Sequence, residues 1–319
     1  MARILYVLWS TGGVTGGQKM IIRHVETLRD LGFDAVCYVS NRAPTLLEHR
    51  APIVVRGPVM PDDIVVVPDD ANETLRQCSQ KPWRTVVFAQ NPYFMAAMGL
   101  EGVDLLASTR PLTVMAVSDG LKRTLKRLYP AAAVEVVRCF ADERLFGPAR
   151  DKRRAVAYTP LKRKLEADAI VAMFKRLHRG HAGFGWAPVE SATERVTADT
   201  FAAASVVLSL NRLESVGMTT LEAMASGCVC AGFRGVGGGE YATPDNGFWV
   251  PEDDCEAAVD ALAEACAVVS EGGAALARRL EAGYETARLW SYAAFRGQLE
   301  ATWMRIAPDA RLQSTALDA

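Results

Sequence analysis

The chain has 319 residues, of which 50% are hydrophobic and 23% charged, and its formal net charge is −1. This length exceeds the usual size of one core, so two domains of about 150 residues each are expected. The near-neutral charge gives no electrostatic basis for a nucleic-acid partner. No apolar run approaches membrane-spanning length, and the N-terminal segment lacks a signal-peptide cleavage region, which together favour a cytoplasmic protein.

The first half of the sequence alternates short apolar segments with amphipathic ones, which predicts a doubly wound α/β domain. Strands are predicted at 4–9, 35–39, 53–56, 64–68, 85–89, 112–117 and 134–138. Helices are predicted at 18–30, 45–50, 73–78 and 120–129. The polar segment 146–154 carries Pro, Gly and several basic residues, and it is the predicted linker between domains.

The same alternation returns after the linker and predicts a second α/β domain. Strands are predicted at 155–159, 184–187, 205–210, 229–233 and 248–250. Helices are predicted at 164–177, 197–204, 218–226, 255–269, 274–288 and 292–306. The predicted divisions are therefore a first domain (1–148), a second domain (149–288), a C-terminal helix (289–307) and a tail (308–319). The glycine-rich segment 233–241 is expected to form a surface loop.

Cysteine and histidine usage argues against a disulfide framework and against a metal site. The seven cysteines are odd in number, include no C-x-x-C pair and fall in apolar segments, so reduced thiols are expected. The four histidines form no ligand-spaced cluster with acidic residues, and the sequence contains no Asp-x-Asp. We therefore expect no metal and no bound cofactor.

The most informative segment reads E-S-V-G-M-T-T-L-E from Glu214 to Glu222 and follows a buried strand. Gly217 is predicted to open a tight turn, and Met218 a helix that ends at Gly227. Glu222 falls at the edge of the apolar helix face, where a carboxylate needs hydrogen-bond partners such as sugar or ribose hydroxyls. The helix N-terminus suits an anion such as a diphosphate. For one isolated Glu, a solvated amphipathic helix explains the pattern as well.

This segment and its continuation L-E-A-M-A-S-G resemble the E-x7-E signature of retaining glycosyltransferases with the GT-B fold, closest to family 4. The resemblance implies two Rossmann-like, doubly wound domains facing a central cleft, with a final helix that returns to the first domain. It places Glu214 near the donor sugar, Glu222 on the ribose, and the amides of the Ser215–Thr219 loop opposite the diphosphate. The donor-binding residues implied are Gly16, Gly17, Ser215, Val216, Gly217, Met218, Thr219 and Glu222.

The glycine-rich segment S-T-G-G-V-T-G-G, residues 10–17, follows the first strand and precedes a helix. It is no Walker A loop, because Lys19 is followed by Met20, and the second strand lacks the acidic residue of a dinucleotide fingerprint. It resembles the glycine-rich loop of family 4, with Gly16 and Gly17 near the donor diphosphate or the acceptor. A plain tight turn explains the segment equally well when it is taken alone.

Two more polar segments follow predicted strands. Basic side chains in Y-T-P-L-K-R-K can neutralise a departing diphosphate, so Lys162, Arg163 and Lys164 join Glu214 as predicted catalytic residues, with a solvated helix start as the alternative. In Q-N-P-Y, the side chains of Gln90 and Asn91 can donate and accept hydrogen bonds beside the sugar. An ordinary Asn-Pro turn is the alternative there.

The leading hypothesis is a retaining, metal-independent glycosyltransferase of polysaccharide biosynthesis. It would transfer a hexose-like sugar from a UDP- or GDP-linked donor to a glycan, lipid-linked or small-molecule acceptor. The basic amphipathic helix Gly120–Leu128 is a candidate for peripheral membrane contact, although an inward-packing surface helix explains it too. One alternative is a protein that binds a nucleotide sugar without transferring it. Another is an α/β-hydrolase using Ser118, whose place before a helix also suits an N-cap.

Overall fold

The computed structural model describes residues 2–8, 15–40, 47–161, 163–190 and 192–312. The chain divides into two compact units: unit 1 comprises Met1–Arg138 and Phe295–Ala319, and unit 2 comprises Cys139–Ala294. The first division therefore falls before residue 139 and not after residue 148. Residues beyond Arg138 join unit 2 because Ala141 donates its N–H to the Trp290 carbonyl (2.8 Å), and because Phe146 is fully buried.

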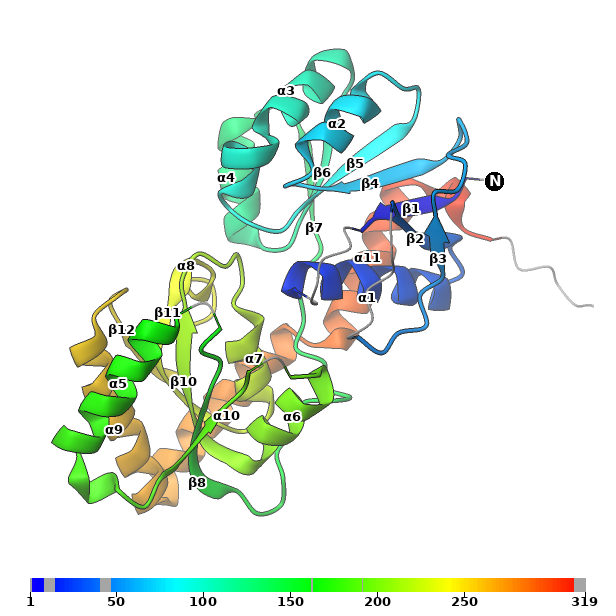
Figure 1. The fold of residues 1–319 in the computed structure, drawn as a ribbon. Coiled ribbons are helices and arrows are strands. Elements are labelled where there is room, and N and C mark those ends of the chain that lie inside the picture. The colour runs from blue at the N-terminus through cyan, green and yellow to red at the C-terminus, as the bar shows by residue number, and fades with distance from the viewer. Residues whose placement is uncertain (1, 9–14, 41–46, 162, 191, 313–319) are drawn as a thin grey trace, which may run out of the picture. The chain divides into compact units, whose positions relative to one another are not determined.

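Unit 1 is built on a parallel sheet of seven strands in the order β3-β2-β1-β4-β5-β6-β7 (Figure 1). The strands are β1 (Ile4–Val7), β2 (Ala35–Val39), β3 (Ile53–Val55), β4 (Ile64–Pro68), β5 (Arg84–Ala89), β6 (Thr113–Ala116) and β7 (Ala133–Val136). The helices are α1 (Gly16–Asp30), α2 (Asn72–Ser79), η1 (Met95–Gly99), α3 (Leu100–Thr109), α4 (Asp119–Leu128), α11 (Tyr292–Ile306) and η3 (Pro308–Ala310). Strand order reverses between β1 and β4, and ligands of doubly wound sheets bind at such a point, beyond the carboxyl ends of the strands.

Unit 2 has a parallel sheet of five strands in the order β12-β11-β10-β8-β9. The strands are β8 (Arg153–Tyr158), β9 (Gly185–Pro188), β10 (Ala204–Asn211), β11 (Val229–Arg234) and β12 (Gly247–Val250). The helices are α5 (Lys164–Leu177), η2 (Arg179–His181), α6 (Glu194–Ala203), α7 (Met218–Ala225), α8 (Gly235–Gly238), α9 (Cys255–Glu271) and α10 (Gly273–Leu289). Helices α5 and α9 pack on one face of this sheet and α6, α7 and α10 on the other (Figure 1). The strand order reverses between β8 and β10, which makes the loops after these strands the expected ligand site.

The predicted strands and most predicted helices are confirmed, but two assignments in unit 1 were wrong. Residues 47–50 of the helix predicted at 45–50 are not helical, and residues 45–46 lie outside the described part of the chain. Helix α3 was missed because Gly99 and Gly102 lower the helix propensity of its sequence. These glycines instead allow close packing: a Cβ on Gly102 would lie 2.5 Å from Asn72 Oδ1, the atom to which the Gly102 N–H donates.

Helix α11 begins in unit 2 and packs its apolar face into the core of unit 1. Phe295, Leu299 and Trp303 recur every fourth residue, share one helix face and are fully buried. The Phe295 ring lies 5.0 Å from the ring of His24 on α1, and the Trp303 ring lies 6.2 Å from that of Tyr6 on β1. Burial in this aromatic cluster lowers the pKa of His24 to about 3, so this histidine is a neutral core residue.

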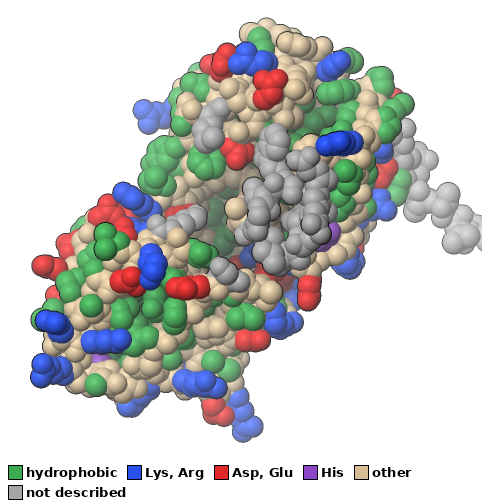
Figure 2. All heavy atoms as spheres, in the orientation of Figure 1, with side chains coloured by type: hydrophobic (Ala, Val, Ile, Leu, Met, Phe, Trp, Pro, Cys, Tyr) green, Lys and Arg blue, Asp and Glu red, His purple; other side chains and the backbone are tan. Residues whose placement is uncertain are grey.

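Three expectations from composition can be compared with the structure. Six of the seven cysteines are buried. None of the helices described has both the length and the apolar character needed to cross a membrane. Acidic and basic side chains are interspersed on the face drawn in Figure 2, with no extended patch of one sign.

Candidate active site

The segment predicted to carry the donor site links β10 to α7 at the carboxyl edge of the unit 2 sheet. Gly217 adopts a left-handed conformation (φ 72°, ψ 57°) and is the N-cap residue of α7. A Cβ at this position would lie 2.4 Å from Asn211 Nδ2. Glycine is therefore required by both backbone geometry and space. The turn at Gly217 and the helix that ends before Gly227 are confirmed.

A buried polar network supports this loop from below. Thr220 Oγ1 accepts a hydrogen bond from Asn211 Nδ2 (2.8 Å) and lies 3.0 Å from Ser209 Oγ. Tyr241 donates its hydroxyl proton to the Gly217 carbonyl (3.1 Å). Burial raises the pKa of Tyr241, which keeps the phenol protonated and able to donate. Because the network is uncharged and its members pair with one another, it fixes the loop without burying a charge.

The glycine-rich segment after β11 was expected to be a surface loop, but part of it forms the short helix α8 against the β10–α7 loop. Val236 donates its N–H to the Arg212 carbonyl (2.8 Å), and Gly237 donates to the Glu214 carbonyl (3.0 Å). A Cβ on Gly237 would lie 2.3 Å from the carbonyl carbon of Ser215. The glycines thus let two backbone segments approach closely, which the sequence alone did not reveal.

The two glutamates of the motif have different surroundings. Glu222 is 5% exposed on α7, whereas Glu214 is half-buried in the loop, where its Oε2 accepts the Arg212 N–H (2.6 Å). Ser215 and Val216 are buried, and the Ser215 hydroxyl has no hydrogen-bond partner among the described residues. Met218 and Thr219 are half-buried and begin α7, whose first amides have no acceptor within the helix. The ligand roles of these residues stay predictions.

Arg163 has a buried side chain that ties together three parts of unit 2. Its guanidinium donates to Glu166 (3.2 Å), Glu252 (3.3 Å), Asp253 and the carbonyl of Asn211 (3.1 Å). The side chain is 1% exposed and its charge is balanced by these carboxylates. Arg163 therefore stabilises the ends of β8, β10 and β12 in this structure, and its predicted contact with a diphosphate remains a prediction.

The other two predicted cations differ from Arg163. The Lys164 side chain is 70% exposed and pairs with Asp168 one helical turn later (2.9 Å), a hydrogen bond that raises the pKa of Lys164. Lys162 lies outside the described residues. Sequence reasoning missed Arg212, which directly follows β10 at the switch point. Its side chain is 54% exposed, and its guanidinium Nη2 lies 3.6 Å from Asp253 Oδ2. The signal in the sequence that could have identified Arg212 is a basic residue two positions before Glu214.

In unit 1, the predicted residues Gly17 and Gln90 are neighbours at the carboxyl edge of the sheet. Gly16 and Gly17 begin α1, and Thr15 caps this helix in a reciprocal capping box with Gln18. A Cβ on Gly17 would lie 2.9 Å from Gln90 Oε1, so the glycine makes room for the amide. Residues 9–14, which include most of the glycine-rich loop, lie outside the described part of the chain.

A buried acid that sequence reasoning missed holds the segment after β5. Asp69, directly after β4, accepts the backbone N–H groups of Gln90 (2.9 Å) and Asn91 (3.0 Å) on its Oδ2. Burial raises the pKa of Asp69 to about 7. Asn91 accepts the Tyr93 N–H on its Oδ1 (2.9 Å), which confirms the turn that was considered for this segment.

The alternative sites in unit 1 have structural explanations. The Ser118 hydroxyl accepts the Leu121 N–H (3.1 Å) and caps α4, as the N-cap interpretation predicted. In the amphipathic helix, Leu121 and Leu125 are buried and Leu128 is 44% exposed. Lys126 donates to the carbonyls of residues 130 and 132 and so caps the C-terminal end of its own helix.

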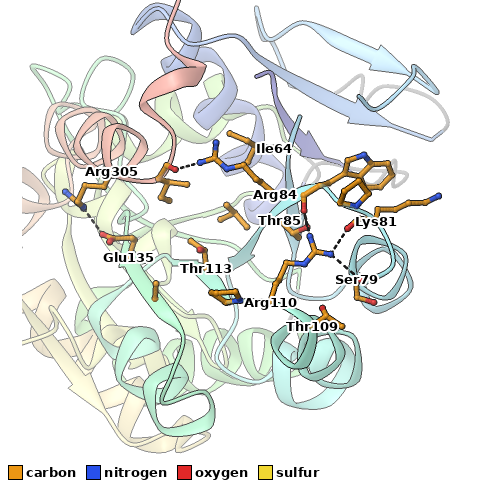
Figure 3. Close-up of a pocket in the computed structure, with 16 residues that line it drawn as sticks. Ile64, Ser79, Lys81, Arg84, Thr85, Thr109, Arg110, Thr113, Glu135 and Arg305 are labelled. Atoms are coloured by element: carbon orange, nitrogen blue, oxygen red, sulfur yellow. Dashed lines mark hydrogen bonds and ion pairs between the residues drawn. The ribbon is translucent and has the colours of Figure 1, made fainter. Parts of the chain in front are cut away.

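A groove of about 720 Å³ lies at the opposite, amino-terminal edge of the unit 1 sheet (Figure 3). It is basic, but its guanidinium groups are already bonded. Arg110 donates to several main-chain carbonyls around the end of α2, Arg84 pairs with Asp309, and Arg305 pairs with Glu135. These cations therefore neutralise helix ends and acidic neighbours, and the groove shares no residue with the candidate site.

The comparisons with known proteins point to one enzyme class. The profile of a family described as "Glycosyl transferases group 1" matches residues 174–267, which include the whole Glu214–Glu222 segment. An alpha-1,6-glucosyltransferase of Actinobacillus pleuropneumoniae is 25% identical over 254 residues, which cover 75% of this chain and 76% of that protein. The chain is a glycosyltransferase.

Solved structures assign the fold of this glycosyltransferase. Sucrose-phosphate synthase from Thermosynechococcus elongatus superposes with a TM-score of 0.67 at 16% identity, covering 95% of this chain and 99% of that one. HepE from Anabaena, solved with UDP and glucose, gives a TM-score of 0.62 at 14% identity, covering 95% and 99%. The glycosyltransferase thus has the GT-B architecture of two parallel-sheet α/β domains, which confirms the predicted fold class.

Proposed function

We propose that this glycosyltransferase transfers a hexose from a nucleoside diphosphate to a sugar-containing acceptor with retention of anomeric configuration. The observation that carries the proposal is the Glu214–Glu222 segment, held by a buried polar network at the switch point of unit 2 and matched by the glycosyltransferase profile. HepE structures are named as complexes with UDP and glucose and with UDP-glucose, and the curated relative is a glucosyltransferase. UDP-glucose is therefore the first donor to test.

In this proposal, each part of the β10–α7 segment has a separate task. Glu222 accepts hydrogen bonds from the ribose hydroxyls, and Glu214 orients the hexose. The amides from Ser215 to Thr219 face the diphosphate, because the first N–H groups of α7 lack acceptors in the helix and carry its positive dipole end. Preorganised donors of this kind stabilise the charge that develops on the departing diphosphate.

The leaving group also requires cations, and we assign Arg212 this role together with Lys164. Arg212 is half-exposed at the switch point, whereas the charge of Arg163 is balanced by Glu166, Glu252 and Asp253. Stabilisation by side chains and amides makes the proposed transfer independent of a divalent metal. Unchanged turnover after chelation with EDTA supports this part, and loss of turnover restored by Mg²⁺ or Mn²⁺ contradicts it.

The decisive experiment measures UDP binding and UDP-glucose turnover in three variants. Glu222→Gln is expected to weaken UDP binding about tenfold, because it removes a charge-assisted hydrogen bond to the ribose. Glu214→Gln is expected to lower turnover while UDP binding is kept. Glu256→Gln, an exposed site on α9, is the control. Tight UDP binding without turnover on any glycoside acceptor would favour the alternative of a binding protein.

Two finer points have their own tests. Retention is measured by the anomeric proton signals of the product formed from the α-linked donor, and a β-linked product contradicts it. Peripheral membrane contact through α4 predicts cosedimentation with vesicles containing anionic lipid but not with neutral ones. Because Lys126 is bonded to carbonyls of its own unit, we expect Arg123→Ala and Arg127→Ala to reduce that binding and Lys126→Ala to leave it unchanged.

A further inference from the structure

Asp69 occupies the position in unit 1 where the topology places ligands, yet its side chain points to the main chain of the protein. It directly follows β4, which flanks the reversal of strand order between β1 and β4. Its side chain is almost fully buried, at 2% exposure of the residue. A buried carboxylate is costly unless it accepts hydrogen bonds, so its partners indicate why it is there.

Those partners are the amides of two predicted acceptor-side residues. One oxygen, Oδ2, accepts from Gln90 (2.9 Å) and from Asn91 (3.0 Å), which bends the chain as it leaves β5. The bend sets the Gln90 side chain against Gly17, where Oε1 is buried and has no hydrogen-bond partner among the residues that the structure describes. A buried amide oxygen that lacks such a partner, beside the N-terminus of a helix that begins with glycine, is available to accept a hydrogen bond from a ligand.

The surroundings of Asp69 contain little compensating charge. Its burial raises its pKa, the two amide hydrogen bonds lower it, and the adjacent carboxylate of Asp70 raises it further. Gly99 of η1 packs closely against the main chain of Asp69, because a Cβ on Gly99 would lie 1.9 Å from the Asp69 carbonyl oxygen. No cation is among the groups that shift this carboxyl in the described structure. Main-chain amides are therefore the described groups that stabilise the ionised form.

We infer that Asp69 is a positioning residue that fixes Gln90 and Asn91 at the carboxyl edge of the unit 1 sheet and makes this edge respond to protonation. The ionised carboxylate accepts two charge-assisted hydrogen bonds and holds the bend tightly. The protonated carboxyl accepts more weakly, so the bend loosens as the pH falls. The inference that this tunes the acceptor side rests on the proposed function, in which Gln90 and Asn91 contact the acceptor.

The positioning role has a test that does not need turnover. In ¹⁵N-labelled protein, the amide signals of Gln90 and Asn91 are expected to shift together with pH, with a midpoint near the pKa of Asp69, about 7. In Asp69→Asn the same signals should be flat over this range. In Asp70→Asn, the matched control, they should still titrate with a lower midpoint, because one acidic neighbour is gone. The inference is overturned if these amide chemical shifts do not change with pH in the wild type, or if they still titrate in Asp69→Asn.

Kinetics with UDP-glucose and a panel of glucosides test the acceptor side. The acceptor KM of the wild type is expected to rise about fivefold between pH 8 and pH 6, with the donor KM and kcat changing less. Asp69→Asn should remove this pH dependence. An identical acceptor profile in wild type and variant contradicts the acceptor part. If no glucoside accepts sugar, the proposed function fails, whereas the amide titration still decides the positioning role.

Discussion

The switch points of the two units are built from the same topology but by opposite electrostatic means. In unit 2, the β10–α7 loop is supported by neutral hydroxyl and amide groups, with Thr220 at the centre. In unit 1, the segment after β5 is held by the single carboxylate of Asp69. A neutral network does not change with pH near neutrality, whereas a buried acid with a pKa of about 7 does.

This difference fits the division of tasks between the two units in the proposed reaction. The donor side of the proposed reaction always meets the same diphosphate and ribose, so a rigid, uncharged support is sufficient for it. At the unit 1 edge, Gln90 Oε1 has no hydrogen-bond partner within the described part of the chain and the supporting carboxyl titrates, so we expect its geometry to adjust more easily.

Substitution of Gly237 tests how closely the β10–α7 loop is packed against α8. In Gly237→Ala, the new Cβ would lie 2.3 Å from the main chain of Ser215, so the loop must move. We expect transferase activity to fall about 100-fold, because small displacements of a catalytic loop are costly, and unfolding free energy to fall by about 3 kcal/mol. Gly239→Ala is the control, since its nearest atom is 3.3 Å away, and equal losses in both variants would contradict the explanation.

Removal of Arg163 tests whether it is mainly structural. Arg163→Ala leaves Glu166, Glu252 and Asp253 without their shared cation, and we expect unfolding by denaturant to show a loss of about 3 kcal/mol. Arg212→Ala should instead leave stability unchanged and lower kcat about 100-fold. The reverse result, a stable Arg163→Ala that has lost activity, would return the diphosphate role to Arg163.

The stability of unit 1 should depend on the ionisation of Asp69. Its pKa of about 7 lies above the value of about 4 in an unfolded chain. As pH rises from 4, the unfolded chain loses its proton first, so wild-type stability falls until about pH 7 and is then constant. The Asp69→Asn variant has no carboxyl to ionise at this position, so its stability does not fall for this reason. It should be more stable than the wild type by about 2–3 kcal/mol at pH 8, but no more stable at pH 4.

Thermal unfolding over this pH range measures the effect of Asp69. Asp70→Asn is again the control. It keeps the buried carboxyl of Asp69, so its stability should fall between pH 4 and pH 7 as that of the wild type does. A stability difference between Asp69→Asn and the wild type that does not vary with pH would show that the carboxyl remains ionised throughout.

The smallest effect is expected in the neutral network of unit 2. Thr220→Val keeps the side-chain shape but removes the acceptor of Asn211 Nδ2 and the partner of Ser209, so a loss of about 1–2 kcal/mol is expected. This loss should be the same at pH 6 and pH 8, because no titrating group is involved. A pH-dependent loss would remove the contrast between the units.

The sequence predicted most of the local structure because apolar periodicity and glycine positions act over short distances. The strands of both sheets, α5 and α11 followed from such patterns, and so did the turn at Gly217. Helix α3 and helix α8 could not be predicted in this way. Their glycines are needed for close contacts with Asn72 and Ser215, which are distant in sequence. Composition also misplaced the boundary between the units, since burial of Phe146 depends on its surroundings in unit 2.

By itself, the sequence determined the fold class and the local course of the segment proposed to bind the donor, because Glu214, Gly217 and Glu222 lie within one strand–loop–helix element. Only the tertiary structure decided which charged side chains are buried. Arg163 and Lys164 are adjacent in sequence, yet one is enclosed by carboxylates and the other lies in solvent. Asp69 gained its role in the same way, because its partners follow another strand, β5, and only the parallel sheet brings the ends of β4 and β5 together.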